Sequence, residues 1–189
     1  MLLIIGGAAR TGKGILSRRL LLETHQPYLS LDVLKMGLVN GVPSFGLDPE
    51  ASAVAIAEQL WPLVRAMAVN MVETDVHYII EGEILPEHAD ELAKRFPTEV
   101  RACFLGYAEI APRRKLAEIR KFGGHPNDWL TDYPDEDVLE LVEQNVEFSR
   151  YLQKECRRLG IPYCDTSESF DSAHNRAFTY LMQSSLQPD

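Results

Sequence analysis

The fold is decided by residues 2–14, which read LLIIGGAARTGKG. An apolar run at residues 2–5 leads into a glycine-rich turn, and residues 15–24 continue with a helical pattern. A strand, a Gly-x4-Gly-Lys turn and a helix in this order predict a phosphate-binding loop. Glycines let backbone N–H groups point into one concavity, and the helix dipole adds positive charge there. An ordinary glycine-rich turn with a surface lysine is the alternative, but it does not account for the flanking strand and helix.

We expect the loop to bind nucleotide phosphates through its backbone, with Lys13 adding a point charge for the β- and γ-phosphates. The residues assigned to this site are Gly7, Ala8, Ala9, Arg10, Thr11, Gly12, Lys13, Gly14 and Ile15.

The residue after Lys13 is Gly14, whereas most such loops have Ser or Thr there, whose hydroxyl binds Mg²⁺. The Gly-Lys-Gly sequence resembles the adenylate kinases and related nucleoside monophosphate kinases, although their usual next Thr is Ile15 here. The resemblance implies ATP and Mg²⁺ as cofactors. It also implies that nucleotide oxygens, waters and carboxylates elsewhere hold the metal, because the loop hydroxyl is missing. The choice between ATP and GTP stays open.

Length and composition predict one domain over residues 1–189, because 189 residues with 46% hydrophobic content can bury a full core. We expect no membrane span, since no apolar run reaches about 20 residues. The first residues lack a basic leader and a cleavage site, so we interpret them as a core strand and not as a signal peptide.

The net charge and the cysteines indicate which partners and which cellular compartment to expect. A net charge of −9 argues against broad nucleic-acid binding, although a small anionic ligand can still occupy a local basic pocket. The widely spaced Cys103, Cys156 and Cys164 fit reduced thiols in a cytoplasmic protein. A protein partner is not predictable from these features.

Apolar runs alternate with helical periods, which predicts βαβ units and a parallel sheet. We expect a three-layer α/β phosphate-loop fold with strand order 2-3-1-4-5. The expected strands are 2–5, 28–31, 76–80, 100–105 and 161–164. The expected helices are 15–24, 33–39, 49–74 and 172–184, with a further helix that starts at Pro86. Pro62 is expected to kink or divide the helix 49–74. Another helix is expected from the N-cap Asp135 to about Leu159, with Gly160 ending it.

Two segments, residues 39–47 and 122–134, lack a regular pattern and are rich in Gly and Pro. In the kinases that the loop resembles, these places carry an acceptor-binding insert and a lid. The resemblance therefore implies an acceptor-binding insert around residues 36–75 and a lid-like segment around residues 110–135. Two plain surface loops are the alternative.

The second strand is followed by Asp32 and Lys35. A carboxylate just past the carboxyl end of a parallel strand faces the ligand crevice. We expect Asp32 to accept a proton from an acceptor hydroxyl or to help hold Mg²⁺, although it can also cap a helix. The stretch resembles kinase patterns with a basic residue at the position of Lys35, which implies acceptor binding. A lysine grips a phosphate less firmly than an arginine fork.

The third strand ends in Ile-Ile-Glu81-Gly-Glu83. The resemblance implies that an acid here belongs to the metal shell, through water, and to the acceptor site. Glu81 is the candidate and Glu83 the alternative; either can instead be a solvated loop acid. Adenylate kinases carry Asp-Gly-Phe-Pro-Arg at this place, and this chain lacks the Phe-Pro-Arg. The short stretch from Ile80 to Pro86 is more similar to 2-phosphoglycerate kinase-type proteins.

Basic residues precede the second irregular segment. Arg113 and Arg120 are seven residues apart, so a helix places them on one face. They are candidate catalytic cations for the transferring phosphoryl group, with Arg114 as a third possibility; a solvated basic face is the alternative.

The segment after the fifth strand contains Thr166 and Ser167. In related kinases this segment borders the adenine base, which implies nucleotide binding here; a helix cap is the alternative.

Together these features predict an ATP-dependent kinase that phosphorylates a small molecule, with a hydroxyl acceptor favoured because the Phe-Pro-Arg is missing. A nucleoside monophosphate kinase, or a nucleotide-binding sensor module without kinase activity, remains an alternative.

Overall fold

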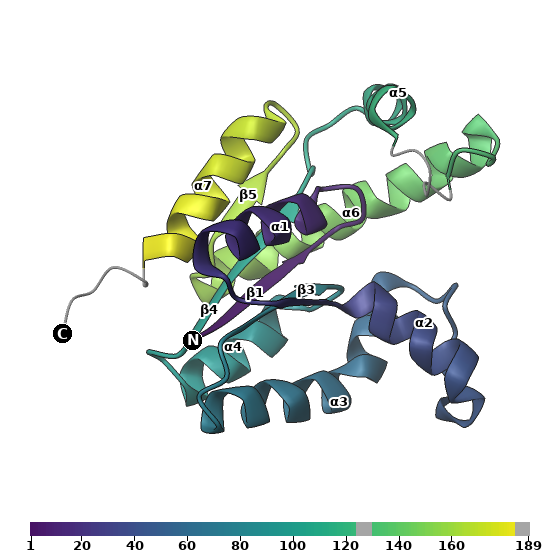
Figure 1. Cartoon of the computed structure of the whole chain (residues 1–189). Coiled ribbons are helices and arrows are strands. Elements are labelled where there is room, and N and C mark those ends of the chain that lie inside the picture. Colours follow the sequence, from purple (N-terminus) through teal and green to yellow (C-terminus); the bar gives the residue numbers. More distant parts are fainter. Residues whose placement is uncertain (124–129, 184–189) are drawn as a thin grey trace.

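The computed structural model of the chain describes residues 1–123 and 130–183 (Figure 1). The strands are β1 (Leu2–Gly7), β2 (Tyr28–Ser30), β3 (Tyr78–Gly82), β4 (Val100–Gly106) and β5 (Tyr163–Asp165). The helical elements are α1 (Lys13–Thr24), α2 (Leu31–Gly41), the 3-10 turn η1 (Pro43–Phe45), α3 (Ala53–Glu73), α4 (Pro86–Arg95), α5 (Pro112–Phe122), α6 (Asp135–Leu159) and α7 (Phe170–Met182).

The five strands form one parallel sheet in the order β2-β3-β1-β4-β5, which confirms the predicted fold class. Strand β1 lies in the middle and is buried along its whole length. In the register of the sheet, Glu81 of β3 lies beside Ile5 of β1 and Ser30 of β2. The carboxyl ends of these three strands therefore meet at one edge.

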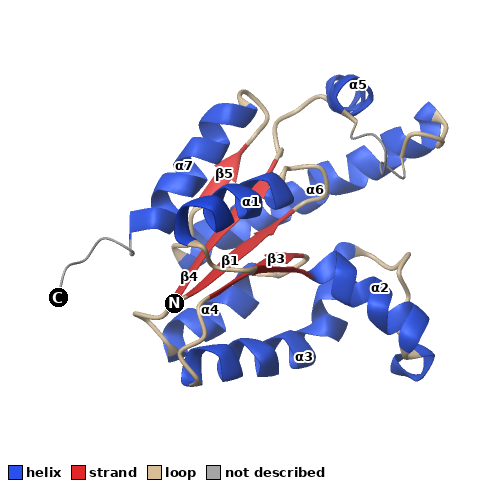
Figure 2. Ribbon diagram, viewed as in Figure 1, coloured by secondary structure: helices blue, strands red, loops and turns tan. Residues whose placement is uncertain are grey.

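Helices cover both faces of the sheet (Figure 2). Side chains alternate along β1, so that Leu3 and Ile5 pack with α1 and α7, whereas Leu2 and Ile4 pack with α3, α4 and α6. Figure 1 shows α2 and α5 at the end of the molecule towards which the strands run. Among the described residues, no helix is both long enough and apolar enough to span a membrane.

Several predicted helix ends differ from the structure. Asp32 and Asp135 are not N-caps, because Ser30 and Pro134 hold those positions and both acids lie in the first turn, where the helix dipole favours a negative charge. Helix α3 begins at Ala53, since the Ser52 side chain accepts a hydrogen bond from the Ala55 N–H, and Pro62 does not divide the helix. Gly160 does end α6, in the left-handed conformation, as predicted.

Gly82 allows β3 and α2 to approach closely at the carboxyl edge. Its φ is +147°, and a Cβ there would lie 2.6 Å from the Cβ of Leu31. Leu31 opens α2 and is buried, so this contact determines where the first turn of α2 lies relative to the end of β3.

We expect Gly82→Ala to lower the free energy of unfolding by more than about 1 kcal/mol, since it combines an unfavourable φ with a steric overlap. Gly37→Ala is the matched control, because Gly37 lies inside α2 and a Cβ there meets nothing within 4 Å. That control should stabilise the protein by about 0.5–1 kcal/mol. Urea denaturation of both variants measures the two effects. Equal stability of the two variants would contradict the close approach of β3 and α2 at Gly82.

Candidate active site

The glycine-rich loop lies between β1 and α1, at the centre of the carboxyl edge. Gly12 is left-handed at φ 81°, and no side chain of the described residues caps the helix that follows. The Lys13 ammonium lies across the loop and donates to the carbonyl oxygens of Gly7 (3.1 Å) and Ala8 (2.9 Å). A Cβ at Gly14 would meet nothing within 4 Å, so the helix end opens onto free space. An uncapped N-terminus with a lysine beside it fits a phosphate group.

The phosphate loop is held in place by hydrogen bonds, two of which come from the distant helices α6 and α7. The Asn145 Oδ1 on α6 accepts from the Ala9 N–H at 2.9 Å. The ring of His174 on α7 donates through Nε2 to the Thr11 carbonyl at 2.8 Å. Thr11 in turn donates from its hydroxyl to the Ala8 carbonyl at 2.9 Å. These contacts hold the loop in shape independently of any ligand.

Gly12 also packs against α7. A Cβ there would come within 2.6 Å of the Phe170 ring and 2.8 Å of the His174 ring. The two rings stack on each other with centroids 4.0 Å apart. Burial lowers the pKa of His174 below its ordinary value, which favours the neutral ring that donates to Thr11.

Lys115 adds a second buried cation on the side of α5. Its side chain is only 7% exposed, and its ammonium lies 4.6 Å from the centre of the Tyr107 ring. Burial lowers its pKa below the ordinary value; Glu118 opposes this, and the nearby Arg10 of the loop adds to it. Arg10 and Lys115 therefore lie close enough for their charges to interact. Sequence reasoning missed Lys115, although it lies one helical turn before the buried Ile119 and so shares its inward face.

The two arginines that the sequence proposed as lid cations differ in their surroundings. Arg113 is exposed at the start of α5. The Arg120 guanidinium donates to the carbonyls of Leu130 (2.7 Å) and Tyr133 (2.6 Å) and to Asp135 Oδ1 (2.9 Å). Arg120 thus ties the end of α5 to the segment before α6. Residues 124–129 of the expected lid-like segment lie outside the described residues.

Asp32, Lys35 and Glu83 come together beside the loop. The Lys35 ammonium lies 3.1 Å from Asp32 Oδ1 and 3.3 Å from Glu83 Oε2. Burial lowers the pKa of Lys35, but the two carboxylates outweigh it and the pKa is raised above its ordinary value. Burial raises the pKa of Glu83, which outweighs the opposing effects of Lys35 and Lys13. Gly82, which precedes Glu83, lies beside Gly6 in the register of the sheet, so this cluster lies next to the start of the phosphate loop.

Glu81 lies deeper, at the end of β3 between β1 and β2. It is 7% exposed, and no described residue makes a hydrogen bond to its carboxylate. Mg²⁺ usually keeps several waters and binds through one or two carboxylates plus the phosphates of a nucleotide. A buried carboxylate that has no hydrogen-bond partner among residues 1–123 and 130–183, beside a phosphate loop, fits such an ion, and the 66% exposed Asp32 side chain can take part as well. The described residues contain no group of three or more His, Cys, Asp or Glu that would hold a metal by itself.

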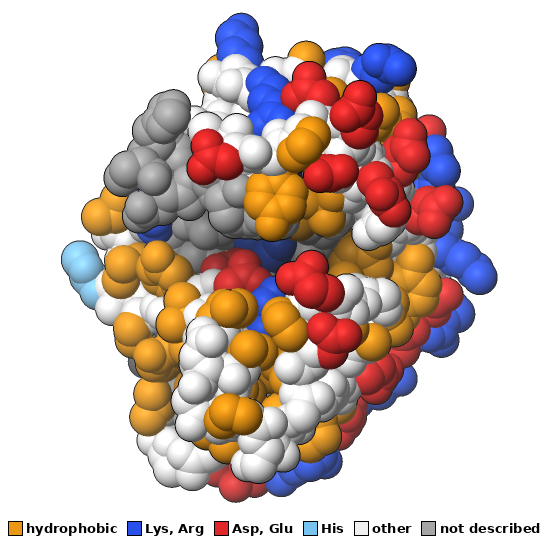
Figure 3. Space-filling model, turned by 90° about the vertical axis from the view of Figure 1, so that its right-hand side faces the viewer, with side chains coloured by type: hydrophobic (Ala, Val, Ile, Leu, Met, Phe, Trp, Pro, Cys, Tyr) orange, Lys and Arg blue, Asp and Glu red, His pale blue; other side chains and the backbone are white. Residues whose placement is uncertain are grey.

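Figure 3 views the molecule from the side of this edge. Basic and acidic side chains gather in a hollow between the upper and lower parts of the surface, and hydrophobic side chains lie around it.

Thr166 and Ser167 hold the end of the sheet and do not cap α7, whose N-cap is Ser169. The Thr166 hydroxyl donates to the Gly106 carbonyl at 3.0 Å, and the Ser167 hydroxyl accepts from the Glu109 N–H at 3.1 Å. Both side chains are buried, so a contact of this segment with a nucleotide base would use its backbone.

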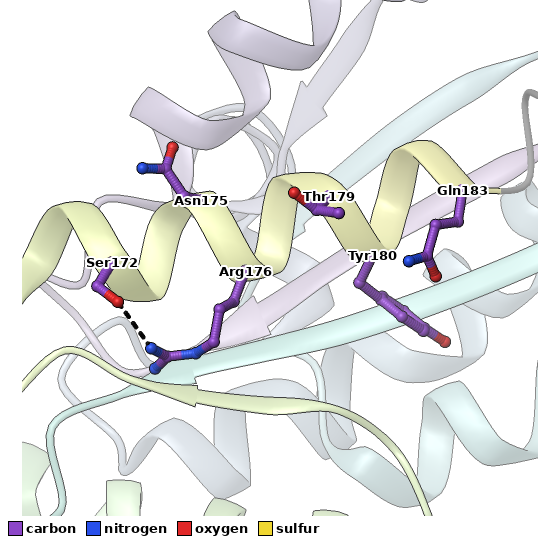
Figure 4. Close-up of a pocket in the computed structure, with 6 residues that line it drawn as sticks. All are labelled: Ser172, Asn175, Arg176, Thr179, Tyr180 and Gln183. Atoms are coloured by element: carbon purple, nitrogen blue, oxygen red, sulfur yellow. Dashed lines mark hydrogen bonds between the residues drawn. The ribbon is translucent and has the colours of Figure 1, made fainter.

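A groove of about 650 Å³ lies on α7, away from the loop (Figure 4). It is lined by Ser172, Asn175, Arg176, Thr179, Tyr180 and Gln183. The first five belong to α7 and Gln183 is its C-cap, and Arg176 is hydrogen-bonded to Ser172 at 2.9 Å. None of the residues proposed for catalysis reaches it.

No protein-family model matches the chain, and no curated protein sequence matches it either. Solved structures do resemble it. A gluconokinase from Sinorhizobium meliloti 1021 is 14% identical, with 96% of this chain and 91% of that chain covered and a TM-score of 0.58. A shikimate kinase from Bacteroides thetaiotaomicron is 13% identical over 96% and 98% of the two chains, with a TM-score of 0.57. The YorR protein of Bacillus subtilis, solved with phosphorylated GDP, is 15% identical over the full length of both chains, with a TM-score of 0.50.

These similarities show the fold. The chain has the five-stranded phosphate-loop fold found in structures of small-molecule kinases, as the sequence predicts. Identities of 13–15% leave the activity and the substrate to be argued from the site itself.

We expect Lys115→Met to stabilise the protein by about 1 kcal/mol or more, because it removes a buried ammonium and keeps the side-chain volume. Since burial lowers the pKa of Lys115 below 10.5, the cost of the charge is fully present while the pH is below the lowered pKa, and it shrinks as the pH rises through that pKa towards 10.5. The same variant should bind Mg-ATP at least about tenfold more weakly if Lys115 faces the phosphates.

Denaturation and nucleotide titration measure the two effects, with Lys154→Met as the control because that side chain is 81% exposed. A variant that is stabilised but binds nucleotide normally would remove Lys115 from the site.

Proposed function

We propose that the protein is an ATP-dependent phosphotransferase that phosphorylates a hydroxyl group of a small molecule. One observation carries the proposal. The glycine-rich loop with Lys13, and the Asp32, Lys35 and Glu83 cluster, lie at the same carboxyl edge of the sheet, since Gly6 lies beside Gly82 and Ser30 lies beside Glu81 in the register of the strands that lead into them. Phosphoryl transfer needs a cradle for the phosphates next to a carboxylate for the acceptor.

Each part of the site has a proposed role. The loop from Gly7 to Ile15 binds the nucleotide phosphates, and the segment with Thr166 and Ser167 borders the base. Lys13 neutralises charge on the transferring group. Arg10 and Lys115 add positive charge on the same side, and Arg113, exposed at the start of α5, is a further candidate.

Asp32 is the proposed base. Its side chain is 66% exposed at the start of α2, so a hydroxyl group can reach it. It would accept the hydroxyl proton as the oxygen attacks, while Lys35 holds the carboxylate in place. Mg²⁺, when bound with the nucleotide near Glu81, supplies charge neutralisation for the phosphates.

We extend the proposal to the division of the chain. Residues 1–189 would form one kinase domain in which the insert around residues 36–75 binds the acceptor and the segment around residues 110–135 covers the nucleotide. The hydrogen bonds of Arg120 support a structural role for it in that segment, so we propose that it acts on catalysis only through the position of the segment.

A nucleoside monophosphate kinase is the second candidate. It would need a cation free to grip the acceptor phosphate. Lys35 is the basic residue nearest to that place, and its ammonium is already shared by two carboxylates. The third candidate is a sensor module that binds ATP and has no acceptor. It differs from both kinases in that its ATP turnover would not depend on an added acceptor.

Lys13→Ala should reduce the release of ADP from Mg-ATP by about 100-fold or more, since one preorganised group on the transferring charge is lost. Lys94→Ala is the control, because Lys94 is exposed and paired with Asp90 on α4. The release is measured with a coupled assay, with and without a panel of hydroxyl compounds and nucleoside monophosphates. Activity that is equal in both variants would exclude this loop as the catalytic phosphate site.

Asp32→Asn should lower acceptor-dependent turnover by about 100-fold or more and leave nucleotide binding within about twofold, because the change removes a base but keeps the shape. Glu23→Gln, an isosteric change at an exposed acid near the end of α1 that is far from the loop, serves as the control. If Asp32→Asn keeps full turnover, the base lies elsewhere.

A further inference from the structure

The charges around the acceptor end of the site limit what can bind there. From residue 26 to residue 64, the part of the chain that contains α2 and the first half of α3, Lys35 is the only Lys or Arg. This region overlaps the segment proposed to bind the acceptor, which spans residues 36–75. Within this part of the chain, Lys35 is therefore the only Lys or Arg that could pair with a negatively charged group on an acceptor.

Lys35 is already fully engaged. Its side chain is 14% exposed, and its ammonium lies within 3.3 Å of oxygens from both Asp32 and Glu83. With one positive and two negative charges, the cluster has a net charge of −1. An anion placed here would meet more negative than positive charge.

The surrounding surface is apolar rather than basic. On α2, Val33 is 70% exposed and Met36 is 44% exposed. Figure 3 shows hydrophobic side chains around the hollow that contains the charged groups. The phosphate side, with Lys13, Arg10 and Lys115, carries the positive charge, so the two halves of the site have opposite character.

On this basis, and resting on the kinase function proposed above, we propose that the acceptor is a hydroxyl compound without a carboxylate or phosphate group, and that a protonated amine on it is favoured by the Asp32 and Glu83 carboxylates. In the transfer, the acceptor oxygen forms a bond to the γ-phosphorus, the bond between this phosphorus and the β,γ-bridging oxygen breaks, and ADP leaves with that electron pair. The hydroxyl proton passes to Asp32. No other reactant is needed.

The test compares hydroxyl compounds that share a skeleton and differ in charge, such as glucuronate, glucose and glucosamine, within a wider library sorted into anionic, neutral and amine-bearing groups. Acceptor-dependent ADP release and phosphorylated product are measured for the full chain with Mg-ATP. We expect every good acceptor to be neutral or amine-bearing, with kcat/KM at least about tenfold above that of its anionic counterpart, since like charges placed together strongly disfavour binding. A carboxylate or phosphomonoester that is the best acceptor would overturn the proposal.

Two variants test whether the cluster causes the preference. Glu83→Gln frees one bond of Lys35 and removes a negative charge, so the ratio of anionic to neutral turnover should rise about tenfold or more. Lys35→Met removes the cation, and amine-bearing acceptors should gain over neutral ones. Glu91→Gln is the control, because Glu91 pairs with Arg65 away from this edge and should leave the ratios unchanged.

The outcomes separate the two levels of the proposal. Ratios that do not change in either folded variant would show that the cluster does not select the acceptor, and the inference would fail while the kinase function stands. ADP release that no compound of any group raises above the Lys13-dependent background would instead overturn the proposed kinase function, and the acceptor inference with it.

Discussion

The burial of β1 in the middle of the sheet constrains everything else in this structure. The strand is paired on one side with β3 and on the other with β4, and its side chains enter the apolar cores on both faces. Because the chain must leave such a strand at the edge of the sheet, the loop from Gly7 to Lys13 opens where the neighbouring parallel strands also end. Acids that follow β2 and β3 are thereby brought to the loop, although they are distant in sequence.

The edge combines two regions of opposite charge. On the side of α5, Lys13, Arg10 and the buried Lys115 provide positive charge where phosphates would lie. On the side of α2, Asp32 and Glu83 outnumber Lys35. Lys115 on one side, and Lys35 and Glu83 on the other, are largely withdrawn from water, so their charges are less screened than surface charges and can discriminate more strongly between ligands. This division is the physical basis for treating the phosphate donor and the acceptor as chemically different partners.

The fold was predictable because its signals are local. The apolar runs and the helical periods identified the strands, and the Gly-Lys-Gly loop was placed between a strand and a helix, where it lies. The strand order followed from the phosphate-loop fold that the loop and its flanks indicate. The N-caps were predicted less well: Asp32 and Asp135 lie in first turns because neighbouring residues took the cap positions. An acid just before a helical pattern suits either place, so local sequence does not distinguish them.

The sequence by itself determined the α/β class, the phosphate loop and the acids that follow β2 and β3, because a glycine-rich turn and the end of an apolar strand are readable from neighbouring residues. Only the tertiary structure decided which groups act together. Asn145 and His174 reach the loop from α6 and α7, Lys115 turns inward beside Arg10, and Arg120 is tied to the segment before α6. It also showed that Lys35 is shared by two carboxylates. Such pairings depend on how helices from distant parts of the chain pack on one sheet, and no local pattern carries that information.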